Sequence, residues 1–144
     1  MSETGTASGW EHFQHGADIG IRGCGATPAA AFAAAGTALT AVIARPETVQ
    51  PTQRIELSCE APDLEFLFLD WINVLVYAMA TEGLLFARFE VTLADDRLQA
   101  TAWGEPVDRA RHQPAVEVKG ATLTALDVHQ QDDGRWLAQC VVDV

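Results

Sequence analysis

Basic residues are scarce in this sequence, and Lys119 is its only lysine. Nine Lys and Arg stand against twenty Asp and Glu among 144 residues, which gives a formal net charge of −11. Tight binding to a nucleic acid backbone or to an anionic membrane surface requires clustered basic side chains. The composition therefore argues against direct binding to nucleic acid and against attachment to a membrane.

Cysteine is scarce as well. The three cysteines, Cys24, Cys59 and Cys140, are widely spaced and form no CxxC pair, a pattern that is typical of neither a disulfide framework nor a zinc site. Each lies in an apolar or alternating segment, which favours a small core side chain. The start of the chain also lacks the apolar stretch of a secretory signal, so we expect a cytoplasmic protein.

The sequence has no long uninterrupted hydrophobic run. The longest apolar stretch, residues 64–80, contains Glu65, Asp70 and Asn73 and is therefore predicted to be a buried helix rather than a membrane span. Hydrophobic residues still make up 49% of the chain, enough for a core without support from a metal or a disulfide. We expect one domain over residues 10–144, preceded by a flexible leader at residues 1–9.

The short motifs of common catalytic and nucleotide-binding sites are absent. The chain contains no GxSxG, P-loop, GxGxxG or HExxH. The four histidines are scattered, and His12 and His15 fall on opposite faces of a predicted strand, which is poor geometry for a shared ligand. The protein is therefore not expected to be an enzyme. A small hydrolase built on two carboxylates is disfavoured because no nucleophile or general base accompanies them.

Two segments carry the periodicity and the end signals of helices. The first, residues 28–44, follows the N-cap residue Thr27, and the second, residues 64–82, ends before Gly83. Apolar residues recur at steps of three and four in both segments. Each segment is therefore predicted to bury one face in the core.

Alternation of apolar and polar residues occupies most of the remaining chain. The predicted strands are residues 10–15, 17–25, 54–60, 84–93, 97–103, 116–130 and 135–144. Short polar turns join neighbouring strands into hairpins, and residues 104–114 are expected to form a connecting loop. The order of these elements predicts an α+β fold of two layers, in which two main helices pack with a mostly antiparallel sheet of six to seven strands.

Two acidic residues are candidate ligands of a cation. Asp18 lies in a strand-like segment near Gly20, and Asp143 precedes Val144, whose α-carboxylate ends the sequence. Adjacent anionic groups repel each other unless solvent, a cation or a basic side chain compensates. Carboxylate and main-chain oxygens suit Ca²⁺, Mg²⁺ or Mn²⁺. The plainer alternatives are a turn or cap role for Asp18 and a solvated terminus for Asp143.

The single lysine lies in the strand-like segment Glu117-Val118-Lys119. Lys119 can serve as a partner for carboxylates, or it can protect the edge of a sheet from pairing with another chain. The residues alone leave both roles open.

Separated motifs of the chain resemble those of the archease family, in the same order. The segment His15-Gly16-Ala17-Asp18-Ile19-Gly20-Ile21 is similar to the amino-terminal signature of that family, and Asp143-Val144 is similar to its terminal Asp-Ile. The further matches are Asp70-Trp71-Ile72-Asn73, Thr81-Glu82-Gly83-Leu84-Leu85-Phe86, Trp103-Gly104-Glu105-Pro106, Arg111-His112 and Glu117-Val118-Lys119. The resemblance covers residues 12–144, nearly the whole chain.

This resemblance implies an accessory protein. Archeases activate the GTP-dependent ligase of tRNA splicing and RNA repair, which joins 3′-phosphate or 2′,3′-cyclic phosphate ends to 5′-hydroxyl ends. They promote guanylylation of the ligase histidine and allow multiple turnovers. By the same resemblance, Asp18, Asp143 and the Val144 main chain hold a divalent cation, and Lys119 takes part in activation. The alternative function is a chaperone-like binding module for RNA-processing proteins without a direct catalytic effect.

Three positions depart from the family pattern. Gly16 replaces the usual Thr, and Leu123 and Thr124 occupy positions where the family often has an aromatic residue and a histidine. The changes remove a hydroxyl, an aromatic ring and an imidazole, but they leave the carboxylates in place. Asp18 and Asp143 converge at one sheet end if residues 17–25 pair with residues 135–144, and a bound cation should then add stability.

Overall fold

The computed structural model describes residues 9–144. Its helices are α1 (Pro28–Ile43), α2 (Leu64–Glu82) and α3 (Arg109–His112), with a 3-10 turn, η1 (Pro46–Thr48), after α1. Its strands are β1 (Gly9–His15), β2 (Asp18–Gly25), β3 (Gln53–Glu60), β4 (Leu84–Ala94), β5 (Arg97–Pro106), β6 (Gly120–Ala121), β7 (Asp127–Gln130) and β8 (Trp136–Asp143). The leader expected at residues 1–9 lies outside the described residues, except for Gly9 at the start of β1.

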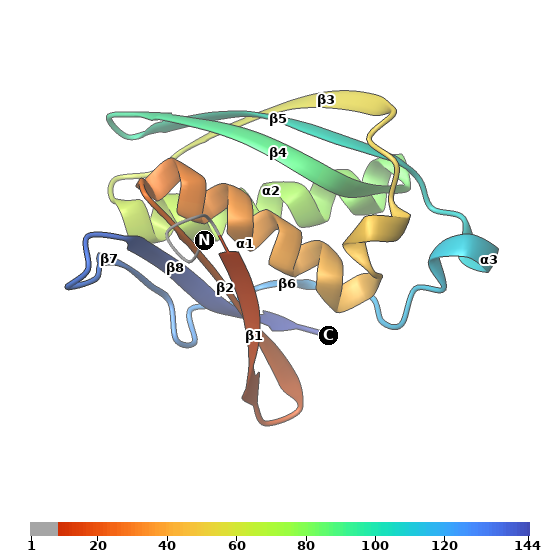
Figure 1. Cartoon of the computed structure of the whole chain (residues 1–144), viewed down its shortest axis with the longest axis horizontal. Helices are drawn as coiled ribbons and strands as arrows, with labels where there is room; N and C mark the ends of the chain where they lie inside the picture. Colours follow the sequence, from red (N-terminus) through yellow and green to blue (C-terminus); the bar gives the residue numbers. More distant parts are fainter. Residues whose placement is uncertain (1–8) are drawn as a thin grey trace.

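Two antiparallel sheets enclose the two long helices (Figure 1). One sheet has five strands, in the order β1-β2-β8-β6 with β7 also paired to β8, and the other has three strands, in the order β3-β5-β4. Helix α1 packs on β2 and on β4, and α2 packs on β3 and on strands of the larger sheet. The core therefore lies on both sides of the helices, and the fold has three layers.

Helix α1 begins and packs as its sequence predicts. The Thr27 hydroxyl accepts the Ala30 N–H at 3.1 Å, and Pro28 occupies the first turn. The alanine-rich face lies close to β2, because a Cβ on Gly23 would come within 2.2 Å of the Ala31 carbonyl oxygen. Small residues on both elements are therefore what allows this close contact between helix and sheet.

Helix α2 lies in the core between the sheets. The Asp63 carboxylate accepts the Phe66 N–H at 2.8 Å, and Gly83, with φ of 64°, ends the helix. Trp71 is fully buried, and its indole N–H donates to the Phe32 carbonyl of α1 at 3.0 Å. By length and composition α2 is apolar enough to cross a membrane, but here one face of the helix packs in the hydrophobic core.

The α+β class, the two main helices and the antiparallel pairing are confirmed. The arrangement differs from the expected two layers, because eight strands form two sheets, one on each side of the helices. The physical reason is visible in α1, whose buried side chains cover most of its circumference. A helix that is apolar around most of its surface must be covered on more than one side.

The predicted strand over residues 116–130 is wrong, because only β6 and β7 within it are strands, and both pair with β8. Between them the chain turns at Ala125, which has a φ of 57°. Thr122 holds the start of this turn, since its N–H and its hydroxyl both donate to the Val141 carbonyl at 2.9 Å. The turn contains neither Gly nor Pro, so the sequence carried no signal for it.

The cysteines act as core side chains. Cys140 is buried, Cys24 and Cys59 are half-buried, and all three are free thiols. Burial raises the pKa of Cys140 to about 12. Burial and the nearby Asp70 carboxylate raise the pKa of Cys59 to about 11. The Cys59 and Cys140 thiols are therefore protonated at neutral pH.

Candidate cation site at the C-terminus

The acidic residues singled out by the sequence lie at one end of the larger sheet. On β2, Asp18 is paired with His15 of β1. The β2–β8 register runs to Ile19 and Val142, so the next opposed residues are Asp18 and Asp143. Directly opposed residues of antiparallel strands project to the same face. Pairing of β2 with β8 therefore places the two residues at the same sheet end, although they come from opposite ends of the chain.

The end of the chain contacts two other segments at this point. The Val144 N–H donates a weak hydrogen bond to the Asp18 carboxylate at 3.4 Å. The Lys119 N–H donates to the Asp143 carbonyl at 2.7 Å, one residue before β6 pairs with β8. Figure 1 shows the C-terminus beyond the end of β8 and beside β6. All four residues that the sequence pointed to thus meet at one place.

The chemistry of this place fits a hard cation. Asp18 is partly exposed, and Asp143 and Lys119 are exposed, so an ion from solvent can reach the carboxylates. Within residues 9–144, no cluster of three or more His, Cys, Asp or Glu side chains is arranged to hold a metal ion. A cation here would therefore depend on two carboxylates and on main-chain oxygens, which are the donors that Ca²⁺, Mg²⁺ and Mn²⁺ accept.

Asn73 holds the strand next to Lys119 against the helix layer. Its side-chain oxygen accepts the Ala121 N–H at 2.9 Å. Gly120 leaves room for this contact, because a Cβ there would lie 3.2 Å from the same oxygen. Asn73 stands off the apolar stripe of α2, and its polarity inside an apolar helix was the only sequence signal of this role. Through β6 it fixes the backbone that carries Lys119.

Replacement of Asn73 by Ala is expected to loosen β6. The Ala121 N–H would lose its acceptor, which costs about 1–2 kcal/mol of unfolding free energy. Amide hydrogen exchange should be faster at Ala121, and chemical denaturation should report the lower stability. The control is Asn73→Asp, which keeps an acceptor oxygen and should retain most of the protection. Unchanged exchange in Asn73→Ala would show that Asn73 does not hold β6.

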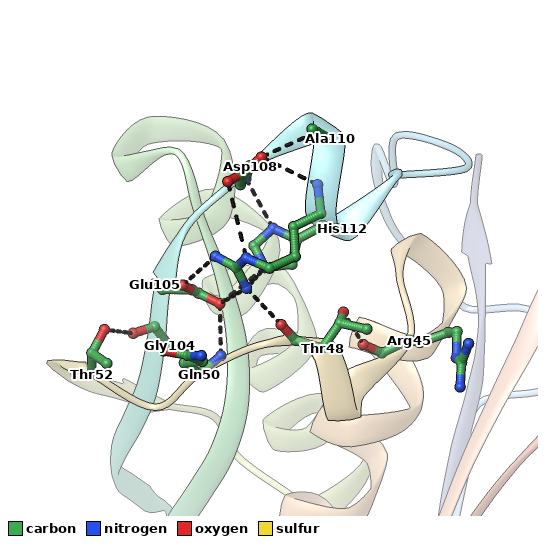
Figure 2. Close-up of polar contacts among 10 residues, drawn as sticks. Arg45, Thr48, Gln50, Thr52, Gly104, Glu105, Asp108, Ala110 and His112 are labelled. Carbon is green, nitrogen blue, oxygen red and sulfur yellow. Dashed lines mark hydrogen bonds and ion pairs between the residues drawn. The ribbon is translucent and has the colours of Figure 1, made fainter.

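A second polar cluster lies where β5 ends, away from the C-terminus (Figure 2). Glu105 is only 7% exposed. Its carboxylate accepts two hydrogen bonds from the Arg111 guanidinium, each of 2.7 Å, and one from the Gln50 N–H at 2.7 Å. The same guanidinium donates to the Thr48 carbonyl at 2.8 Å. Glu105 and Arg111 therefore join β5, α3 and the segment after α1.

His112 completes this cluster and has a defined tautomer. Its Nδ1 accepts the Asp108 N–H at 2.9 Å, so the ring proton is on Nε2, which lies 3.0 Å from the Glu105 carboxylate. Hydrogen bonds from Arg111, together with the Gln50 N–H and the His112 ring, lower the pKa of Glu105 from 4.5 to about 2, against the opposing effect of burial. At neutral pH Glu105 is therefore ionised, and both of its carboxylate oxygens are hydrogen-bonded.

The cluster holds in place the segment of residues 104–114, which precedes Lys119 in the chain. The segment from residue 104 to residue 114, expected to be a loop, instead contains the end of β5 and the short helix α3. Asp108 caps α3 by accepting the Ala110 and Arg111 N–H groups at 3.1 and 3.2 Å. After α3, the Ala115 N–H donates to the Ile43 carbonyl at 2.8 Å. The chain is thereby tied to the core shortly before Lys119.

The positions that depart from the family pattern have plain structural settings. Gly16 has φ of 60° and forms the turn between β1 and β2, directly before the strand that carries Asp18. Leu123 is 64% exposed, and the Thr124 N–H donates to the Thr122 hydroxyl at 3.2 Å. Gly16 therefore suits the left-handed backbone at its position, and residues 123 and 124 belong to the turn between β6 and β7.

The fold and the site define a small α+β domain of three layers in which the C-terminus contacts Asp18 and the Lys119 main chain at one sheet end. A family model described as "Archease protein family (MTH1598/TM1083)" matches residues 10–144. The chain therefore belongs to the archease family, as its motifs indicate.

Relatives and a solved structure agree with this assignment. The chain is 38% identical over 139 residues to "Protein archease" of Pyrococcus furiosus and 39% identical over 139 residues to that of Pyrococcus abyssi; each match covers 94% of this chain and 98% of the relative. It is also similar to the solution structure of Methanobacterium thermoautotrophicum protein 1598, with a TM-score of 0.82 and 27% identity over 94% of this chain and 99% of that chain.

Proposed function

We propose that this protein is a metal-dependent accessory protein that activates a GTP-dependent tRNA-splicing and RNA-repair ligase by promoting its guanylylation and multiple turnover. Membership of the archease family supports an accessory protein of RNA processing rather than an enzyme. One observation carries the proposal of metal-dependent ligase activation. Asp18, the Asp143-Val144 terminus and the Lys119 backbone meet at one sheet end through direct contacts.

A divalent cation, Ca²⁺, Mg²⁺ or Mn²⁺, would be held by the Asp18 and Asp143 carboxylates and by main-chain oxygens of Val144. When bound, it would neutralise the clustered carboxylates and offer a positive centre to phosphate oxygens. Backbone N–H groups of this chain hold the ligands in place. The Val144 N–H positions the Asp18 carboxylate. The Lys119 N–H donates to the Asp143 carbonyl and so holds the main chain directly before Val144.

The charge of the protein suits a transient complex with such a ligase. An enzyme that binds RNA presents basic surface around its active site. A partner with a net charge of −11 is attracted to that surface, which increases the association rate without requiring a large permanent interface. Contact with RNA is then made by the ligase and not by this protein. We place the protein in the cytoplasm with its partner.

The experiment that tests this proposal is RNA joining under multiple turnover. The purified ligase is supplied with GTP, divalent metal and excess RNA ends, with and without this protein. We expect several rounds of joining per ligase only when the protein is present. Lys119→Ala should reduce the activation, whereas Arg97→Ala, which removes an exposed guanidinium on β5 of the other sheet, should not.

The chaperone-like alternative makes a different prediction in the same assay. A module that only stabilises its partner would increase the amount of soluble ligase and leave the turnover of each folded ligase unchanged. Quantifying folded ligase by active-site titration separates the two outcomes. Equal turnover per folded ligase with and without the protein would contradict the proposed activation.

A further inference from the structure

The edge of the three-stranded sheet at β3 is open to pairing. Within residues 9–144, β3 is paired on one side only, with β5, and Figure 1 shows it at the border of that sheet. The Ala61 N–H donates to the Asp96 carbonyl at 3.0 Å, which continues the β3–β5 ladder by one residue. Because the direction of hydrogen bonding alternates along an antiparallel strand, the even-numbered residues of β3 point their N–H and C=O groups away from β5.

We propose that β3 pairs with β3 of a second copy of this chain, antiparallel about a twofold axis at Leu57. In this register Arg54 of each copy lies opposite Glu60 of the other, and Glu56 lies opposite Ser58. Opposite charges directly across a strand pair stabilise it. The strand sequence is therefore complementary to itself, with an ion pair at each end of the new ladder.

Neighbouring registers are disfavoured by the same charges. A shift that centres the pairing on Glu56 or on Ser58 sets Glu56 opposite Glu56 or opposite Glu60, and like charges facing each other destabilise a strand pair. In the proposed register the charges instead extend contacts that each chain already makes. Glu60 is paired with Arg97 of β5, so Arg54 of the second copy would continue that row across the interface.

The inner side of β3 packs only partly against α2. A hollow of about 340 Å³ lies between β3 and α2 and is lined by Leu57, Cys59, Asp70, Asn73, Val74, Tyr77 and Ala78. Tyr77 is 71% exposed, and Leu57 is only half-buried. In the proposed dimer Leu57 faces Leu57 of the second copy at the rim of this hollow. The pairing therefore covers apolar surface as well as bare main chain.

The free edges of β4 and β6 are less suited to pairing. The β4 edge has a register shift between Phe86 and Arg88, and β6 has only two residues. Bulges and very short strands are devices that discourage edge pairing. β3 has eight residues in an unbroken register and contains no proline. Charged side chains on an edge strand usually discourage pairing, but in the proposed dimer Arg54 and Glu60 of the two copies lie opposite each other.

Sedimentation equilibrium on the full chain tests the proposal through a charge reversal. Arg54→Glu and Glu60→Arg each place like charges opposite each other at both ends of the ladder, so each should weaken dimerisation on the order of tenfold. The double variant Arg54→Glu/Glu60→Arg restores both pairs and should regain dimerisation. Glu90→Arg is the control, because it makes the same charge change on the same sheet face at β4 and should have no effect.

Cross-linking tests the register. Leu57→Cys in a Cys59→Ser background should form a disulfide between two copies under mild oxidation, since the two positions coincide on the axis. Ile55→Cys with native Cys59 should give a cross-link between position 55 and position 59. A chain that stays monomeric up to about 1 mM, or a dimer indifferent to both charge variants, would overturn the proposal. Neither result depends on the ligase.

Discussion

Replacement of Asp18 or Asp143 by Asn is expected to abolish activation of the ligase while leaving the fold intact. Asn keeps the size of Asp, and at Asp18 it keeps an oxygen that can accept the Val144 N–H. What it removes is the negative charge, on which the affinity for a hard cation depends. Loss of a direct ligand should weaken metal binding by at least roughly tenfold to a hundredfold. RNA-joining assays with each variant should show this loss of ligase activation.

Metal-induced stabilisation provides a second readout of the same change that does not involve the ligase. A cation that binds only the folded state adds about 2.7 kcal/mol at a concentration of one hundred times its Kd. Thermal unfolding of the native chain should therefore shift upward with added Ca²⁺ or Mn²⁺, and the shift should disappear in Asp18→Asn. Asp132→Asn, in an exposed turn, is the matched control and should keep it.

The free C-terminus can be tested in the same two assays. A C-terminal tag turns the α-carboxylate of Val144 into an amide and crowds the end of β8. We expect both the metal-induced shift and the activation to decrease, whereas a tag at the other end of the chain should have little effect. If the tagged protein and both Asn variants responded like the native chain, the cation would have to be held elsewhere.

Replacement of Glu105 by Gln is expected to produce a large loss of stability. The carboxylate is nearly buried and accepts bonds from Arg111, Gln50 and His112. An amide would face these donors with donors of its own and would leave the guanidinium without its counter-charge. The expected cost is roughly 2–4 kcal/mol, or a decrease in Tm of roughly 10 °C. Glu47→Gln, on an exposed glutamate, should change stability by less than about 0.5 kcal/mol.

The same residue should govern part of the acid sensitivity of the fold. The pKa of Glu105 falls from 4.5 to about 2 on folding, so its ionised form stabilises the native state. That contribution is complete above pH 4.5 and is lost as the pH decreases toward 2. The unfolding free energy should therefore fall steeply over this range in the native chain and less steeply in Glu105→Gln. Parallel pH profiles for the two proteins would contradict this role.

Local signals were sufficient to locate both long helices. A Thr cap at the start of α1 and a glycine at the end of α2 act within a few residues of the helix ends, so Thr27 and Gly83 were readable from the sequence. The division of the strands into two sheets was not readable in this way. Pairing partners are chosen by the whole core, and a helix packed on two sides gives little indication of which strand covers which side.

The same distinction applies to the candidate site. The convergence of Asp18 and Asp143 followed from one expected pairing, that of β2 with β8, and the structure brings the two residues together. Their role as cation ligands stays a prediction. The contacts that support the site joined residues far apart in the chain: Asn73 with Ala121, and Glu105 with Gln50. Such contacts depend on how two separate elements meet, so a local pattern could mark Asn73 as a polar residue in an apolar helix but could not identify its partner.

The measurement that tests the central proposal most directly is the rate of ligase guanylylation. A fixed amount of folded, purified ligase is incubated with GTP and divalent metal, and formation of the ligase–GMP adduct is followed with time. We expect faster guanylylation with the native chain and no acceleration with Asp18→Asn or Asp143→Asn. An equal rate with and without the native chain, at concentrations where the two proteins bind, would contradict it.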